Sequence, residues 1–361
     1  MPKSSAHASP SGVPGVLDEA GAKKDLRHAL RAAYALKYSA TTVDGAEGTK
    51  AEASRGICED VLETIGRTPM VRLRRVVPSG AAEIVCKLEF FSPGGSIKDR
   101  AALAMIEDGE RRGLVVPGTT VVEPSGGNTG VGLAMVCAVR GYRCVIVVPE
   151  TTSKDKLGVL RAFGAEVVTA RADVDADDPE GYIGVAERIA RDRAGFMPDQ
   201  FENPANPGVH AKTTGLEILE QCDGDLQAFV ACVGSGGTLG GVSRVLRENV
   251  RDVEIVGAAP DRSRTIVEGV VDDLDSCAVH GVAPDHVELV SDADAVAMML
   301  ALAKEEGILA GTSSGVAVCA AIRVAKRLGA GKRVVAIVPD TGRNYLSSCL
   351  DPAWRAARGM P

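Results

Sequence analysis

One lysine of the chain is placed where its amine could bond covalently to a carbonyl carbon. Lys98 follows a Gly-Gly-Ser turn and precedes the apolar residues 101–106, which open a segment predicted to be helical over 101–112. Ser96 and Asp99 have the spacing of a capping box, so the helix is expected to begin here with Lys98 in its first turn. A helix amino end and burial both disfavour an ammonium ion, which suits this lysine to imine chemistry. A surface lysine beside a helix cap is the alternative.

A second segment is rich in glycine and side-chain amide or hydroxyl groups. It follows the apolar stretch 119–124 and consists of Ser125, Gly126, Gly127, Asn128 and Thr129. Strand-to-helix turns of this composition direct backbone N–H groups at anions, and a substrate carboxylate would fit. The alternative is a tight turn in which Asn128 only caps the following helix.

A third segment reads GSGGTLGG over residues 234–241, again between a predicted strand and a predicted helix. Its spacing does not match a dinucleotide-binding loop, and it lacks the Gly-Lys-Ser/Thr of a P-loop. A single phosphate is the simpler ligand for such a helix amino end. The alternative is a glycine-rich turn that binds nothing.

A fourth segment, residues 311–315, places Ser313 before another helix, where a serine could cap the helix or bond a ligand nitrogen. A site for pyridoxal phosphate is predicted by four features together: the reactive lysine, the carboxylate turn (residues 125–129), the phosphate cup (residues 234–241) and this serine. That cofactor carries one phosphate, one aldehyde, one phenolic oxygen and one ring nitrogen, and the protein's task is to position it.

Seven short apolar stretches alternate with helical ones after Val61. The apolar stretches are 83–90, 119–124, 144–150, 165–170, 228–234, 253–260 and 333–340, and the helical ones are 101–112, 131–140, 153–164, 239–249 and 316–329. Nearly continuous apolar strands are typical of parallel sheets buried on both faces, so the pattern predicts a doubly wound α/β fold.

We expect two mostly parallel sheet domains. The larger would combine residues 56–97 and 209–361 and hold the phosphate cup, and the smaller would span 98–208 and hold the carboxylate turn. Residues 1–55 are rich in Ala, Ser and Gly and read as an N-terminal extension with one helix within 23–38.

Composition excludes several classes of function. A net charge of −7 and only 3% aromatic residues argue against nucleic-acid binding. No apolar run reaches the roughly 18 residues of a membrane helix. None of the nine cysteines forms a C-x-x-C pair, so no metal site is expected, and most should be small buried residues in a reducing compartment. The first 15 residues lack the apolar core of a secretory signal, which predicts a cytoplasmic protein.

The region from Val61 to Trp354 resembles the cystathionine β-synthase and cysteine synthase family, whose members are pyridoxal-phosphate enzymes of fold type II. Four stretches carry the resemblance: LEFFSPGGSIKDR, AVRGYRCVIVVPE, FENPANPGVHAKTTGLEI and GTSSGVAV. It implies a homodimer that acts on small amino acids.

The resemblance also implies roles for single residues. Lys98 would form the imine with the cofactor and move the substrate's α-proton, Asn128 would bond the phenolic oxygen, and Ser313 would pair with the ring nitrogen. A neutral serine there makes the ring a weaker electron sink, which suits elimination. The cofactor phosphate would be held by Gly234, Ser235, Gly236, Gly237 and Thr238. The substrate carboxylate would be bound by Ser125, Gly126, Gly127, Thr129 and Gln200.

Two departures from the family pattern lie in the implied substrate site. Where the family usually has Thr-Ser-Gly-Asn-Thr, this chain has a glycine at 126, so one hydroxyl is missing. The family's Gly-Ile-Gly is replaced by Gly269-Val270-Val271, at the expected entrance of the second substrate. Gly126 could weaken carboxylate binding by one hydrogen bond, or could admit a bulkier amino acid.

The resemblance implies β-replacement on L-serine or an O-activated serine through an aminoacrylate. Homocysteine as the nucleophile would give cystathionine, and sulfide would give cysteine. The two departures keep open a specialised synthase that adds an amine or another nucleophile to make an unusual amino acid. A catalytically silent scaffold is disfavoured because the lysine and all four cofactor segments are present.

Overall fold

The computed structural model describes residues 56–175, 178–262, 265–270 and 283–361, which belong to one compact unit, residues 53–361. The predicted N-terminal extension, 1–55, with its expected helix, lies outside the described residues, and so does Val271.

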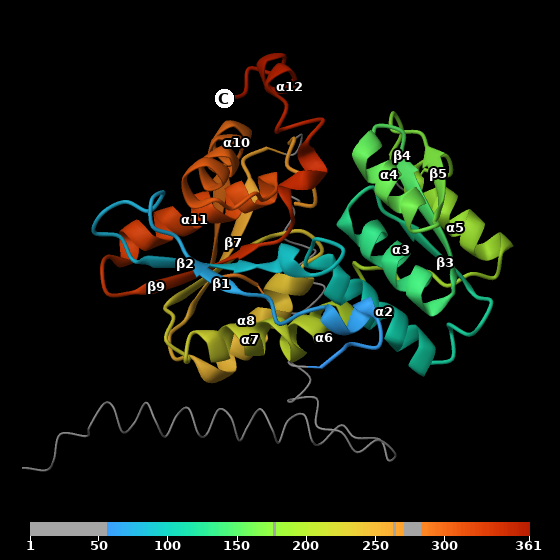
Figure 1. Ribbon diagram of the computed structural model, residues 1–361, viewed down its shortest axis with the longest axis horizontal. Helices are drawn as coiled ribbons and strands as arrows, with labels where there is room; N and C mark the ends of the chain where they lie inside the picture. Colours follow the sequence, from blue (N-terminus) through green and yellow to red (C-terminus); the bar gives the residue numbers. More distant parts are fainter. Residues whose placement is uncertain (1–55, 176–177, 263–264, 271–282) are drawn as a thin grey trace, which may run out of the picture. The chain divides into compact units, whose positions relative to one another are not determined.

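A six-stranded sheet carries the first hydrophobic core (Figure 1). Its strand order is β1-β2-β9-β6-β7-β8, and every neighbouring pair is parallel except β1 with β2. The strands are β1 (Met70–Arg72), β2 (Glu83–Leu88), β6 (Ala228–Cys232), β7 (Glu254–Pro260), β8 (His286–Val290) and β9 (Arg333–Val338). The central strands are buried almost throughout, as expected for parallel strands covered on both faces.

Helices cover both faces of this sheet. On one face, α11 (Thr312–Leu328) packs against β2, β6, β7, β8 and β9, and α10 (Asp292–Ala301) packs on α11. On the other face lies α8 (Gly237–Asn249), with α6 (Ala205–Lys212) and α7 (Thr214–Gln221) packed against it. The sheet therefore lies between the orange and the yellow-green helices in Figure 1.

A three-stranded parallel sheet forms a second core, in the order β3 (Thr120–Pro124), β4 (Arg143–Pro149) and β5 (Glu166–Ala170). One of its faces packs on α5 (Tyr182–Asp192), and the other on α3 (Asn128–Arg140) and α4 (Lys154–Ala162). Helix α2 (Lys98–Arg111) packs against both α3 and α6, so it joins the two cores. The short elements are η1 (Val61–Thr64), η2 (Glu89–Phe91), the π-helical turn η3 (Leu302–Glu306), η4 (Gly342–Tyr345) and α12 (Pro352–Ala356).

The predicted α/β class with mostly parallel sheets is confirmed, and each of the seven apolar stretches contains a strand. The edge strands β1 and β8 and the helices α5, α6, α7, α10 and α12 were not predicted from the sequence. The domain boundaries near residues 98 and 208 stay a prediction.

None of the described helices is long and apolar enough to cross a bilayer. Within the described ranges there is also no group of three or more His, Cys, Asp or Glu side chains that could hold a metal ion. The eight cysteines in these ranges are all free thiols. Five are buried, Cys232 and Cys319 are partly buried, and Cys58 is exposed, whereas Cys277 lies outside the described residues.

Candidate active site

Helix α2 begins at Lys98, so the lysine lies in the first helical turn as predicted. The cap differs from the expected box, because the N-cap residue is Ile97, whose backbone N–H donates to the Pro339 carbonyl at 2.8 Å. Ser96 Oγ accepts from the Lys98 N–H at 3.2 Å, while the Asp99 carboxylate reaches further back and accepts from the Gly94 N–H at 2.7 Å. The Ile97 bond ties the start of α2 to the chain just after β9.

The Lys98 amine points to the turn before α8. Its Nζ donates to Ser235 Oγ over 3.0 Å. Burial lowers the pKa of Lys98 from 10.5 to about 8, although the nearby Glu123 carboxylate acts in the opposite direction. Glu123 is itself buried, which raises its pKa to about 8, and its Oε2 accepts from the Asp199 N–H at 3.1 Å. The free amine, which is the nucleophile, is therefore accessible near neutral pH.

The turn after β3 is held together by Ser125. Its Oγ accepts from the N–H groups of Gly130, at 3.1 Å, and Gly127, at 3.3 Å. Thr129 Oγ1 donates to Gln200 Oε1 over 2.6 Å, so two residues predicted to share the substrate carboxylate lie in direct contact. At Gly126, a Cβ atom would lie only 2.9 Å from Thr152 Oγ1 and 3.3 Å from Pro149 Cδ.

Asn128 is not the cap of α3, so that structural alternative is wrong. The N-cap residue is Gly127, and Asn128 is the first helical residue. Its Nδ2 donates to Asp340 Oδ2 at 2.9 Å, and its Oδ1 accepts from Asn344 Nδ2 at 3.2 Å. The amide is thus fixed by residues that follow β9 rather than by its own helix.

Glycine is required at three positions of the turn before α8, for different physical reasons. Gly236, the N-cap residue, has φ +75°, a conformation that only glycine adopts at little cost. A Cβ on Gly234 would lie 2.5 Å from the Gly269 carbonyl oxygen, and one on Gly237 would overlap the Asn206 amide. No side chain caps α8, so its first N–H groups face the turn without a side-chain acceptor.

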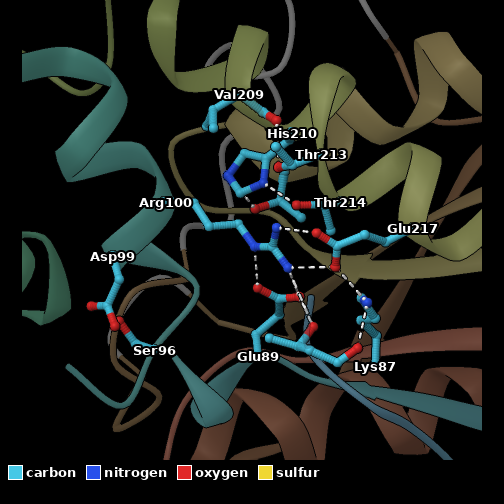
Figure 2. Close-up of polar contacts among 12 residues, drawn as sticks. Lys87, Glu89, Ser96, Asp99, Arg100, Val209, His210, Thr213, Thr214 and Glu217 are labelled. Carbon is cyan, nitrogen blue, oxygen red and sulfur yellow. Dashed lines mark hydrogen bonds and ion pairs between the residues drawn. The ribbon is translucent and has the colours of Figure 1, made fainter. Parts of the chain in front are cut away.

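The hydroxyls of this turn have partners of their own. Ser235 Oγ accepts from Asn206 Nδ2 at 2.9 Å as well as from Lys98. Thr238 Oγ1 lies 3.3 Å from His210 Nε2. On the other side of the ring, His210 Nδ1 is 2.9 Å from Thr214 Oγ1 (Figure 2). Complete burial lowers the pKa of His210 well below 6.5, so the ring is neutral and can fix the orientation of the Thr238 hydroxyl.

Ser313 is the second residue of α11 and is buried. The N-cap of α11 is Gly311 with no side-chain cap, so the alternative of a capping serine is wrong. The hydroxyls of its neighbours Thr312 and Ser314 are buried with no hydrogen-bond partner.

Sequence reasoning missed Asp340, which bonds Asn128, and Tyr345, which bonds Asp340. Asp340 follows β9, and its Oδ2 accepts from both Asn128 Nδ2 and the Tyr345 hydroxyl, the latter at 2.8 Å. Its Oδ1 is buried without a partner, and burial raises the pKa of this carboxyl. The available signal was its place after the carboxyl end of a parallel strand, where α/β proteins gather their ligand contacts.

A buried ion cluster anchors α2 through Arg100, two residues after Lys98, and Figure 2 shows its members. Arg100 pairs with Glu89 at 2.8 Å and with Glu217 at 2.6 Å, and Lys87 pairs with Glu217 at 2.7 Å. Burial alone would raise the pKa of Glu217, but hydrogen bonds and charges of Arg100 and Lys87 lower it to about 2. The cluster holds α2 against η2 and α7, and so fixes the helix start that carries the reactive lysine.

This set of donors fits pyridoxal phosphate. The uncapped amino end of α8 and the Ser235 hydroxyl suit a phosphate, and the Lys98 amine with its lowered pKa lies within hydrogen-bond distance of that turn. Among these groups, the unpartnered hydroxyls at the start of α11 are the kind of buried polar atom that a ligand would satisfy.

Similar proteins also point to pyridoxal phosphate as the cofactor. The family model described as pyridoxal-phosphate dependent enzyme matches residues 61–340. Cysteine synthases of Staphylococcus aureus strains Mu50 and N315 are 45% identical over 302 residues, which are 81% of this chain and 96% of each relative. Among solved structures, O-ureido-L-serine synthase has a TM-score of 0.75 and 36% identity, covering 83% of this chain and 100% of that one. The O-acetylserine dependent cystathionine beta-synthase from Helicobacter pylori has a TM-score of 0.76 and 33% identity, covering 81% and 98%.

Proposed function

The chain belongs to the family of pyridoxal-phosphate dependent enzymes and is of the cysteine synthase and cystathionine β-synthase type, and on that basis we propose that it joins an O-activated serine to a thiol. The observation that carries the proposal is the Lys98 amine, with a pKa lowered to about 8, bonded to Ser235 at the uncapped start of α8. The donor is O-acetylserine in the first instance, as supported by the structural similarity to a synthase that depends on it.

The reaction replaces the group on the β-carbon of serine. The bond between this carbon and oxygen breaks, acetate leaves with the electron pair, and a carbon–sulfur bond forms as the thiol gives up its proton. Bound pyridoxal phosphate supplies the electrophilic aldehyde and the electron-withdrawing ring. Lys98 moves the α-proton at Nζ, and Ser235 Oγ accepts a hydrogen bond from that atom and thereby orients it.

The other residues bind and orient. The phosphate site is assigned to the α8 amino end and its turn, residues 234–238, with Thr238 oriented by neutral His210. Asn128, fixed by Asp340, is assigned to the phenolic oxygen, and Ser313 to the ring nitrogen. The turn 125–129 and Gln200 are assigned to the substrate carboxylate, which is supported by the bond between Thr129 and Gln200.

A specialised synthase is a second candidate. It is favoured by Gly126, which removes one hydroxyl from the carboxylate turn, and by the similarity to O-ureido-L-serine synthase. In this case the nucleophile is an amine or another non-thiol group.

The protein is further proposed to be a cytoplasmic homodimer. The free thiols of the described cysteines suit a reducing compartment. Leu114 and Val116, which follow α2, are large apolar side chains left exposed, as at a surface that a second copy could cover. Light scattering of the purified protein would give the mass of a dimer; the mass of a monomer at all concentrations would contradict this part.

One experiment separates the two candidate functions. Purified holoenzyme is mixed separately with serine, O-acetylserine and O-phosphoserine, and the cofactor absorbance is followed. The donor that changes the spectrum is then offered to sulfide, homocysteine and amines. The proposal predicts a thioether product with O-acetylserine, and product from amines alone would favour the specialised synthase instead.

A further inference from the structure

Lys156 is a buried charge at the edge of the candidate site. It lies in the first turn of α4, and its side chain is only 5% exposed. Buried lysines are rare unless paired, and this one forms an ion pair with Glu268 and lies 5.7 Å from the centre of the Tyr345 ring. Burial lowers the pKa of Lys156, while the charge of Asp340 acts against this.

The neighbours of Lys156 border the site on several sides. Thr152, four residues earlier, is the side chain nearest to the Cβ position of Gly126 in the carboxylate turn. Glu268 precedes Gly269, whose carbonyl lies against Gly234 at the phosphate turn. Tyr345 bonds Asp340, which in turn holds Asn128. These contacts place Lys156 at the periphery of the same site, near the departure at Gly269-Val270.

The ion pair is asymmetric. Whereas Lys156 is buried, the Glu268 side chain is 44% exposed. The turn that carries Lys156 is fixed, because the carboxylate of its neighbour Asp155 accepts from the Ser347 N–H at 3.2 Å and from the Ser347 hydroxyl at 2.5 Å. An anion that arrives from solvent can therefore replace the Glu268 carboxylate without moving the ammonium.

We propose that Lys156 binds the carboxylate of the nucleophile, in exchange for Glu268, and so selects a carboxylate-bearing thiol over sulfide. The inference rests on the proposed thiol-adding function. A charge-assisted hydrogen bond in a buried setting is strong enough to decide between substrates. A thiol with a carboxylate can form this bond with Lys156, and sulfide cannot. If Lys156 only neutralised Glu268 and Asp340, it would affect all nucleophiles alike.

The test uses two thiols that differ only in charge, 3-mercaptopropionate and 3-mercaptopropionamide, with holoenzyme and O-acetylserine. The wild type is expected to have a KM for the acid lower than that for the amide by about tenfold or more. Lys156→Met should bring this ratio close to one, Lys156→Arg should retain a preference for the acid, and Glu268→Gln should increase it because a competing carboxylate is removed. Lys154→Met, an exposed lysine in the same helical turn, is the matched control and should leave the ratio unchanged.

Equilibrium binding gives a readout without turnover. The two thioether products, S-(2-carboxyethyl)-L-cysteine and its side-chain amide, are titrated into holoenzyme, and their dissociation constants are taken from the cofactor absorbance. Lys156→Met should weaken the acid selectively. Equal effects of Lys156→Met on acid and amide, or no preference for the acid in the wild type, would overturn the assignment of Lys156. If Lys156→Met fails to fold, an unchanged ratio of the two KM values in Glu268→Gln would overturn it. Failure of the wild type to use any thiol, sulfide included, would instead refute the proposed function.

Discussion

Gly126→Ser tests whether the departure in the carboxylate turn serves substrate binding or packing. A Cβ at this position would lie 2.9 Å from Thr152 Oγ1 and 3.3 Å from Pro149 Cδ, both closer than ordinary contact. The added hydroxyl could regain a hydrogen bond worth about 1.5–3 kcal/mol when its partner is charged. The overlap, however, arises at the Cβ itself, whose place is fixed by the backbone, so either the turn or the Thr152 side chain must shift before the hydroxyl can help.

Overpacking of this kind costs about 1–3 kcal/mol, which corresponds to roughly 5- to 150-fold in rate. We therefore expect Gly126→Ser to lower kcat/KM by a factor in this range for every amino-acid donor. The assay is kcat/KM for serine, O-acetylserine and O-phosphoserine. Thr152→Ala removes the nearest atom, so the double variant Gly126→Ser/Thr152→Ala should recover much of the loss when compared with Thr152→Ala alone.

A higher kcat/KM in the single variant would show that the missing donor, not the space, limits carboxylate binding. No change for any donor would mean that the turn does not contact the carboxylate, and the substrate-site assignment would be refuted with it. A loss that Thr152→Ala does not relieve would place the clash with Pro149 or with the substrate instead of with Thr152.

Three further predictions concern the cofactor site and its support. Gly236→Leu should sharply weaken pyridoxal phosphate binding, because the residue has φ +75° and its side chain would enter the turn before α8; full cofactor retention after dialysis would count against this site. The rate at which apoenzyme forms its imine with added pyridoxal phosphate should rise with pH and level off above about 8, because the pKa of Lys98 is lowered and the free amine reacts; a rate still climbing above about pH 10 would disagree. Glu217→Gln should lower the free energy of unfolding by about 3 kcal/mol at neutral pH, because the carboxylate has a pKa near 2 in the fold and about 4.5 when unfolded. Its contribution is present above about pH 4.5 and is lost as the pH falls toward 2, so the difference from wild type in urea unfolding should shrink in that window and a constant difference would speak against the ion cluster.

The interior of the fold could be predicted from sequence because parallel strands buried on both faces are almost entirely apolar. The strands that were missed lie at the two edges of the larger sheet. β1 has only three residues, and β8 contains His286 and Glu288 among its five. Edge strands are short or charged because one side is not paired, so they leave no continuous apolar run to detect.

The candidate site was only partly predictable for a different reason. The glycine and hydroxyl segments are contiguous, so their composition and their place before helices could be read directly. The capping roles considered for Asn128 and Ser313 are wrong, because the N-cap residue of each helix is a glycine and the Asn128 amide bonds a residue 212 positions away. Tyr345 and Lys156 matter through contacts between distant parts of the chain, for which a single sequence carries no local signal. For Asp340 the signal was its place after a parallel strand.

The identity of the lysine that holds the cofactor decides every other assignment in the site. Lys156 is the natural competitor, because it too is buried near the site and has a lowered pKa. Reduction of the holoenzyme with borohydride fixes the imine as a stable pyridoxyl adduct, and peptide mapping then locates it. We predict one adduct per chain, on Lys98, and its loss in Lys98→Ala with the fold retained. An adduct on Lys156 or on any other lysine would contradict the assignment from which the mechanism follows.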